Sequence, residues 1–107
     1  MRYVFDIDGT ICTRTDGTYE AAEPYAGRIK YINELHDDGH KITFMTARGM
    51  GRHNGNAELA HRDLYDFTHN QLTQWGAKFH NLVLGKPDGD LFIDDKGINC
   101  GRFFNHE

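Results

Sequence analysis

The sequence has few cysteines and prolines, no long apolar run and no surplus of positive charge. Its 107 residues include two cysteines and two prolines, and the formal net charge is -4 at pH 7. Two cysteines do not make the disulfide framework of a small secreted domain, so we expect Cys12 and Cys100 to be free thiols in a reducing compartment. No apolar stretch reaches the ~18 residues that a membrane-spanning helix needs. Lysines and arginines are scattered without a basic stripe, which argues against general nucleic-acid binding.

Large apolar side chains, by contrast, are numerous enough for one core. The chain contains seven phenylalanines, five tyrosines and one tryptophan, and its length suits a single domain over residues 1–107. The N-terminus begins directly with strand-forming residues rather than with the charged and apolar regions of a signal peptide. We therefore expect a single cytoplasmic domain.

Hydrophobic periodicity alternates between strand and helix patterns along the chain. Strand patterns occur at 2–7, 41–46, 81–84 and 91–93. Helix patterns occur at about 25–38 and 56–75. Residues 11–23 carry an Asp-Gly turn signal and predict a short hairpin or flap over the end of the first strand, and residues 97–107 are expected to add a short helix or edge strand. The alternation is typical of an α/β fold, here a Rossmann-like three-layer sandwich with a mostly parallel central sheet.

The last two predicted strands lie close together in the chain. Only residues 85–90 separate 81–84 from 91–93, whereas a crossover between parallel strands takes a dozen or more residues. Two alternatives stay open. Either one segment is not a regular parallel strand, or the link runs extended across the edge of the sheet.

Two carboxylates mark the end of the first predicted strand. Asp6 and Asp8 are two residues apart, so their side chains point to the same side. Such a pair repels itself unless a cation or a proton is shared between the two groups. An apolar strand leads straight into the pair, which favours metal binding or acid–base chemistry over a solvated loop.

Further polar groups follow the other strand patterns. Thr46 ends the second strand, Lys86 precedes the last, and Asp94 and Asp95 follow it. Ligands of open α/β sheets bind at the carboxyl ends of the strands. The carboxylates suit a hard divalent cation, and the hydroxyl and ammonium groups suit an anion beside it. A phosphoryl group bound beside a divalent cation would use both sets of groups.

In this order the motifs resemble those of the haloacid dehalogenase (HAD) superfamily of phosphohydrolases. Asp-Ile-Asp-Gly-Thr at 6–10 matches the first motif without departure. Thr46 matches the second motif, Lys86 the third, and Asp94-Asp95 the fourth. The resemblance covers nearly the whole chain and implies a HAD-like fold.

The resemblance also implies an activity, that of a magnesium-dependent phosphomonoester hydrolase with an aspartyl-phosphate intermediate. Asp6 is then the nucleophile and Asp8 the general acid and base. Thr46 donates to a phosphoryl oxygen and Lys86 offsets charge. The Gly9 amide is expected to contact the phosphate.

The cofactor implied by the resemblance is Mg²⁺. Its expected ligands are Asp6, the main-chain carbonyl of Asp8 and one acid of the fourth motif, with Asp94 as the direct ligand and Asp95 behind it. Asp90 fits a variant of the fourth motif, but no apolar run precedes it, so we expect it to begin a strand rather than to bind the metal.

Most members of the superfamily insert a cap domain, for which this chain has no room. A capless site implies either a bulky substrate or closure by a second subunit of a homo-oligomer. The loop that contains Arg48 and Arg52 is similar to small capless phosphatases of polysaccharide biosynthesis, which suggests a phosphorylated sugar or polyol as substrate. Both arginines are then candidate substrate-binding residues, as are Tyr19 and His53 on weaker grounds, although solvated loop positions are an equal alternative for the arginines.

Other function classes fit less well. A two-component receiver domain uses similar groups in another order, because Lys86 here precedes the acidic pair. A glycosyltransferase with an Asp-x-Asp metal site needs a longer chain. A nucleotide or polynucleotide-end phosphatase and a non-catalytic binding or assembly protein of the same fold stay open. Cys12 has no evident base partner, and no zinc-site spacing links the histidines, which are His36, His40, His53, His61, His69, His80 and His106.

Overall fold

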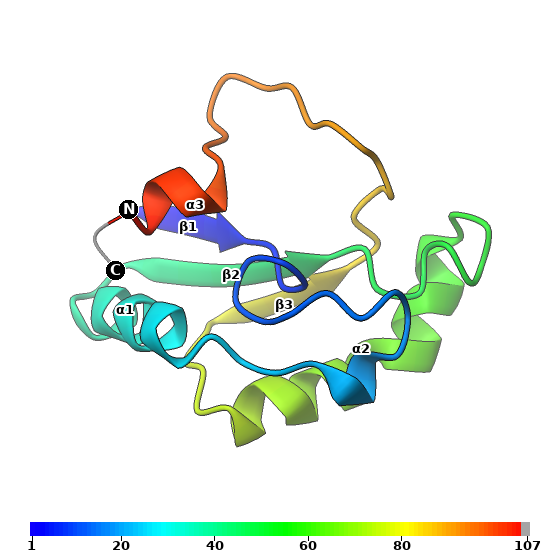
Figure 1. Cartoon of the computed structure of the whole chain (residues 1–107), viewed down its shortest axis with the longest axis horizontal. Coiled ribbons are helices and arrows are strands. Elements are labelled where there is room, and N and C mark those ends of the chain that lie inside the picture. The colour runs from blue at the N-terminus through cyan, green and yellow to red at the C-terminus, as the bar shows by residue number, and fades with distance from the viewer. Residues whose placement is uncertain (106–107) are drawn as a thin grey trace.

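Three parallel strands form the centre of the molecule. They are β1 (Arg2–Phe5), β2 (Lys41–Thr46) and β3 (Asn81–Leu84). The strands pair in the order β1-β2-β3, with Phe5 opposite Phe44 and Phe44 opposite Leu82 (Figure 1). This computed structural model describes residues 1–105. The predicted strands at 41–46 and 81–84 are confirmed, and the first strand ends two residues earlier than predicted.

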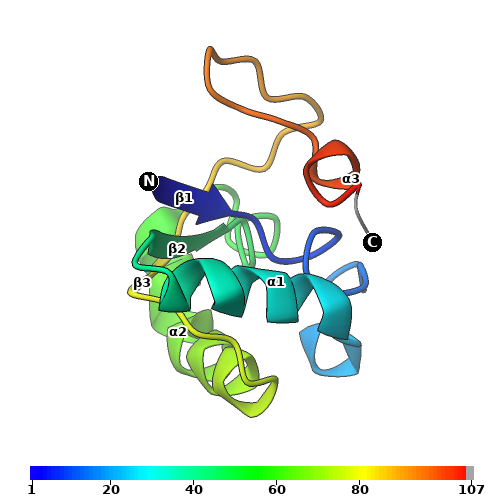
Figure 2. The same ribbon diagram turned by 90° about the vertical axis from the view of Figure 1, so that its left-hand side faces the viewer.

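Two helices connect the strands and pack on the same face of the sheet. They are α1 (Ala26–Asp37) and α2 (Ala57–Gln74), close to the predicted bounds. Both lie on one side of the sheet in Figures 1 and 2. Alternate strand residues are buried under them, because successive side chains of a strand point to opposite faces.

The opposite face of the sheet is open. Val4 and Val83 point to it and are 65% and 41% exposed. A third helix, α3 (Cys100–Phe103), packs beside β1 on the face of α1, since the Phe103 ring contacts both Phe5 and Tyr31. Residues 1–105 therefore form a two-layer α/β arrangement. The predicted three-layer sandwich is wrong for this part of the chain, because no helix of it lies on the second face.

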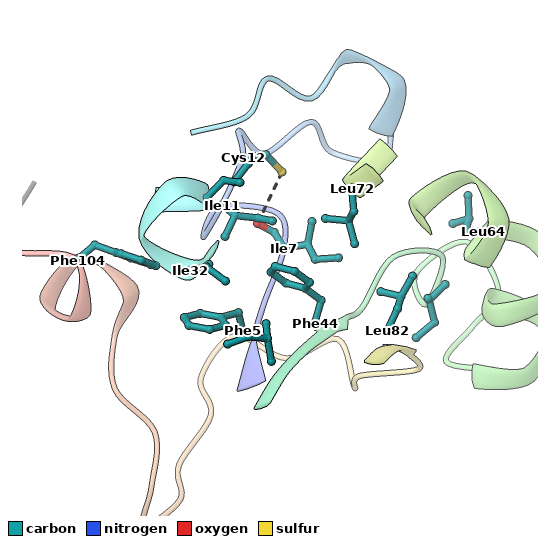
Figure 3. Packing of buried hydrophobic residues seen from close by; sticks show 13 residues of the cluster. Phe5, Ile7, Ile11, Cys12, Ile32, Phe44, Leu64, Leu72, Leu82 and Phe104 are labelled. Carbon is teal, nitrogen blue, oxygen red and sulfur yellow. Dashed lines mark hydrogen bonds between the residues drawn. The ribbon is translucent and has the colours of Figure 1, made fainter. Parts of the chain in front are cut away.

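The core lies between the sheet and the helices (Figure 3). Phe44 on the central strand is fully buried, and its ring contacts Phe5 and Phe79. Ile7, between the two acids of the first motif, and Ile11, directly after that motif, are fully buried as well. The backbone that carries Asp6 and Asp8 is thus anchored by apolar side chains.

The predicted strand at 91–93 is wrong. Residues 91–93 form neither strand nor helix, and Leu91, Phe92 and Ile93 are 78%, 52% and 87% exposed. The segment 85–99, here called the arm, runs as a loop from β3 to α3 (Figure 1). Of the two alternatives that the short link left open, the structure takes the first, since six residues do not return the chain for a parallel pairing.

The segment between β1 and α1 forms a flap rather than a regular hairpin. It contains one short 3-10 helix, η1 (Tyr19–Ala21), and isolated bridges that pair Cys12 with Asp8 and with Pro24. Cys12 and Cys100 are free, as predicted. The predicted short element near the C-terminus is α3, while His106 lies outside the described residues. Within residues 1–105, no helix combines the length and apolar character needed to cross a membrane.

The start of α2 offers a test of local stability. The Asn56 side chain caps the helix, since its Oδ1 accepts a hydrogen bond from the Leu59 amide at 3.1 Å. We expect Asn56→Ala to lower the free energy of unfolding by about 1 kcal/mol, because a helix amide loses its acceptor. Urea denaturation measures this. Asn56→Asp keeps the acceptor and should match the wild type, and an alanine variant of wild-type stability would contradict the capping role.

Candidate functional site

The carboxyl ends of the strands open into a polar pocket of about 940 Å³. Four predicted catalytic residues line it, namely Asp6, Asp8, Thr46 and Lys86. They come from the end of β1, the end of β2 and the start of the arm. The sheet thus brings together groups that lie up to 80 positions apart in the sequence, the separation of Asp6 and Lys86.

Asp6 and Lys86 form the charged centre of the pocket. The Lys86 ammonium lies 3.8 Å from Asp6 Oδ2 and 4.4 Å from the centre of the Phe92 ring. The Lys86 amide donates to the Thr46 carbonyl at 3.1 Å, which fixes the arm to the end of β2. Burial raises the pKa of Asp6 above its usual value, and the Lys86 charge partly opposes this shift. Lys86 thus compensates the charge of the Asp6 carboxylate only in part.

Asp8 forms a bidentate ion pair with Arg48, which the sequence analysis had proposed as a substrate-binding residue. Arg48 Nε and Nη2 donate to the two Asp8 carboxylate oxygens at 2.9 and 3.0 Å. The Arg48 side chain is fully buried and also donates to Thr68 Oγ1 at 3.4 Å. The prediction that Arg48 binds substrate is therefore wrong for this arrangement, because its guanidinium is buried and occupied by Asp8. A glycine-rich loop suggested a solvated arginine, and the partner lies 40 residues away in sequence.

The Thr46 hydroxyl and the Gly9 amide each form a hydrogen bond to the backbone beside these charges. Thr46 Oγ1 accepts a hydrogen bond from the Arg48 amide at 3.1 Å, which leaves the hydroxyl hydrogen for a pocket ligand. The Gly9 amide donates to the Cys12 carbonyl at 2.8 Å. The predicted contact of this amide with phosphate is thus wrong in this structure, since the donor is already used within the turn.

The structure does not bring Asp94 and Asp95 to the pocket. Asp94 Oδ1 accepts from the amides of Lys96 and Gly97 at 2.7 and 2.6 Å, and these bonds lower the pKa of Asp94. Both acids lie on the exposed arm, because the strand that was to deliver them does not form. Within residues 1–105, no group of three or more His, Cys, Asp or Glu side chains is placed to hold a metal ion. Of the predicted metal ligands, only Asp6 and Asp8 reach the pocket.

Tyr19 fixes the flap over the pocket. Its hydroxyl accepts from the Gly49 amide at 3.0 Å, and its carbonyl accepts from Gln71 Nε2 at 2.8 Å. The guanidinium groups of Arg48 and Arg52 lie 4.8 and 5.8 Å from its ring centre. Tyr19 therefore joins the flap to the loop after β2 and to α2.

Arg52 and His53 share one partner at the rim. Arg52 lines the pocket, but its Nη1 lies 3.1 Å from Asp63 Oδ2 and its Nη2 donates to the Gly17 carbonyl at 3.4 Å. His53 Nε2 contacts the same Asp63 oxygen at 3.1 Å and does not line the pocket. Both residues therefore link the loop after β2 to Asp63 of α2.

Several pocket residues were not singled out from the sequence. Arg14 lines the pocket from the flap, and Asp88, Phe92 and Asn99 line it from the arm, as does Asp90, which was set aside as a metal ligand. The only sequence signal for Arg14 was its place in a segment expected to fold over the strand end. For Asp88, Phe92 and Asn99 the sequence gave no signal, because the apolar residues at 91–93 matched a strand.

Cys12 is not a nucleophile in this site. Its thiol is fully buried and donates to Asp8 Oδ1 at 3.5 Å and to the Ile7 carbonyl at 3.7 Å, the latter drawn as a dashed line in Figure 3. Burial, with the Asp8 charge beside it, raises the pKa of the thiol to about 12. The reactive form of a cysteine is the thiolate, which this environment suppresses.

Comparison with known proteins supports the fold. No protein-family model and no curated protein matches the chain. A target protein from Vibrio cholerae, whose crystal structure is known, is similar in structure with a TM-score of 0.87 and 24% sequence identity. The match covers 95% of this chain and 85% of that one. At this identity the likeness concerns the fold alone, that of a small α/β domain with an open parallel sheet.

Proposed function

We propose that this chain is a magnesium-dependent phosphomonoester hydrolase of the HAD type, with Asp6 as the nucleophile. The observation that carries the proposal is the Asp6–Lys86 pair at 3.8 Å in an open polar pocket that also contains Asp8 and Thr46. These are the residues of the first three motifs of the superfamily. The HAD-like form of the α/β fold is part of the same proposal.

In the first step, an Asp6 carboxylate oxygen attacks the phosphorus atom of the ester. The bond between phosphorus and the leaving oxygen breaks, and Asp8 gives that oxygen a proton. Lys86 and the Thr46 hydroxyl stabilise negative charge on the phosphoryl oxygens. In the second step, Asp8 takes a proton from water, whose oxygen attacks the aspartyl-phosphate. Inorganic phosphate leaves and the Asp6 carboxylate is restored.

The ion pair with Arg48 bears on both roles of Asp8. Asp8 Oδ1 accepts from Arg48 Nη2 and from the Cys12 thiol, whereas Oδ2 accepts from Arg48 Nε alone and keeps a lone pair for a second donor. A proton can therefore reach Asp8 from the pocket while the guanidinium holds the carboxylate in place. Arg48 acts here as a positioning residue, because it touches Asp8 and not the pocket ligand.

A magnesium ion would find only part of its ligand set among the residues that line the pocket. Carboxylate and carbonyl oxygens are the ligands that Mg²⁺ prefers, and Asp6 together with the Asp8 carbonyl supplies them. The fourth-motif acids are on the arm, so the donor set in the pocket is incomplete in this arrangement.

The pocket walls favour a phosphorylated sugar or polyol over a polynucleotide end. Thr15, Thr18 and Asn99 offer polar groups for hydroxyls, and Phe92 exposes an aromatic ring to the pocket. Asp88, Asp90 and Asp16 also line the pocket and would repel the further phosphates of a polynucleotide. The flap, rather than a cap domain, covers the site. The open side of the pocket leaves room for a bulky leaving group.

A panel of phosphate esters tests the proposed function. Purified protein with Mg²⁺ is expected to release phosphate from sugar or polyol phosphates faster than from nucleotides or 3′- and 5′-phosphorylated oligonucleotides. Chelation with EDTA should remove this activity and added Mg²⁺ should restore it. Preference for nucleotide or oligonucleotide ends would overturn the substrate class. Failure on every ester would favour a non-catalytic binding or assembly protein.

A further inference from the structure

The cations around the pocket differ in what they are bound to. Lys86 lies beside Asp6, Arg48 is bound to Asp8, and Arg52 is bound to Asp63. Arg14 also lines the pocket, yet within residues 1–105 its side chain forms no hydrogen bond or ion pair. A phosphate dianion in this pocket would therefore meet one arginine whose donors are all available.

Arg14 reaches the catalytic turn across Gly9. A Cβ atom built on Gly9 would lie 3.2 Å from Arg14 Cγ, 3.4 Å from Cδ and 3.5 Å from Nε. Gly9 also has a φ of 81°, a conformation that favours glycine. The arginine stem thus lies directly over the turn that joins Asp8 to Thr10. Its positive charge is near enough to Asp6 to lower the pKa of that carboxyl, against the larger effect of burial.

The backbone that carries Arg14 is fixed on its N-terminal side. The Thr13 amide donates to the Glu23 carbonyl at 3.0 Å, and the Glu23 amide donates to Thr13 Oγ1 at 2.9 Å. On the other side, Tyr19 holds the flap to the loop after β2. The guanidinium is exposed and unbound, but its attachment point is held on both sides.

We propose that Arg14 binds the phosphoryl group that is transferred to Asp6, an inference that rests on the proposed function. A guanidinium presents paired N–H donors that match two phosphate oxygens at once. The other candidate donors are occupied, because Arg48 holds Asp8 and the Gly9 amide closes its own turn. In this arrangement Arg14 donates paired N–H groups to the phosphoryl oxygens, Lys86 contributes a positive charge, and Thr46 donates its hydroxyl.

Binding of inorganic phosphate tests this assignment without requiring turnover. Isothermal titration of the full chain gives the dissociation constant for the wild type and for Arg14→Gln, Arg14→Lys and Arg62→Gln. Arg62 is an exposed residue of α2 paired with Glu58, so Arg62→Gln removes the same charge away from the pocket. We expect Arg14→Gln to weaken phosphate binding about tenfold to a hundredfold, the range for a hydrogen bond to a charged group. Arg14→Lys should restore part of this, and Arg62→Gln should lie within about threefold of the wild type because distant exposed charges are screened.

The outcomes separate this inference from the proposed function. Equal phosphate affinity of Arg14→Gln and Arg62→Gln would overturn the assignment, as would a wild type that does not bind phosphate. If Arg14 governs phosphate binding but no ester is hydrolysed, the anion site stands and the hydrolase proposal fails. If esters are hydrolysed through Asp6 and Arg14→Gln binds phosphate normally, only the assignment of Arg14 fails. Arg14 has no partner to lose, so unfolding temperatures of the variants should match and show that each is folded.

Discussion

Asp6→Asn is expected to abolish phosphate release, by more than about a thousandfold in kcat/KM, which is the scale on which removal of a catalytic nucleophile acts. An amide has the shape of the carboxylate but does not form the acyl-phosphate bond. The fold should be unaffected or slightly stabilised. Burial raises the pKa of Asp6, so the folded state disfavours its charged form, and the neutral amide avoids that cost. Steady-state kinetics on the best ester and thermal unfolding measure both effects.

A matched control separates charge from chemistry. Asp66 is an exposed residue of α2, and Asp66→Asn makes the same substitution outside the pocket. Its kcat/KM should stay within about twofold of the wild type, since screened surface charges act weakly. Substantial turnover by Asp6→Asn, within tenfold of this control, would show that Asp6 is not the nucleophile.

Arg48→Met is expected to give the largest loss of stability, about 3 kcal/mol, because breaking a buried ion pair leaves its partner uncompensated. Methionine approximates the arginine stem and fills much of its space. What is lost is the pair of hydrogen bonds to Asp8, the bond to Thr68 and the charge above the Tyr19 ring. Urea denaturation at neutral pH gives the free energy of unfolding. Turnover should fall as well, since Asp8 then lacks its support.

A double-mutant cycle with Asp8→Asn isolates the pair. We expect a coupling energy of about 1 to 3 kcal/mol between positions 8 and 48, as for residues in one ion-pair network. Arg52→Met is the comparison, because its ion pair with Asp63 is exposed and should cost less than about 1 kcal/mol. Additive effects of Asp8→Asn and Arg48→Met would mean that the two side chains stabilise the fold separately.

The sequence predicted the elements whose pattern is local. The central strand at 41–46 alternates buried residues with exposed or half-buried ones, and the helix at 56–75 carries its own cap, so neither needs distant information to be recognised. Residues 91–93 show the limit of that approach. Their apolar character fits a strand, but a strand also requires a partner, and the six residues before them do not provide the return path.

The same limit applies to the candidate site. Asp6, Asp8, Thr46 and Lys86 were predicted because strand ends meet at one edge of a parallel sheet, and they do line one pocket. The fate of an arginine depends instead on which acid lies near it in space. Arg48 was expected either to bind substrate or to be a solvated loop residue, and it is buried against Asp8, 40 residues away in sequence. The hydrophobic periodicity of the sequence does not indicate an ion pair between residues so far apart.

The strand order has a consequence for folding during synthesis. The strands lie in the sheet in the order in which they leave the ribosome, so β1, α1 and β2 can pair before β3 exists. Within residues 1–105, no later strand has to be inserted between two earlier ones. The carboxylates of Asp6 and Asp8 are then in place early, and Lys86 joins them only after β3 has docked. Assembly of the site would report completion of the sheet.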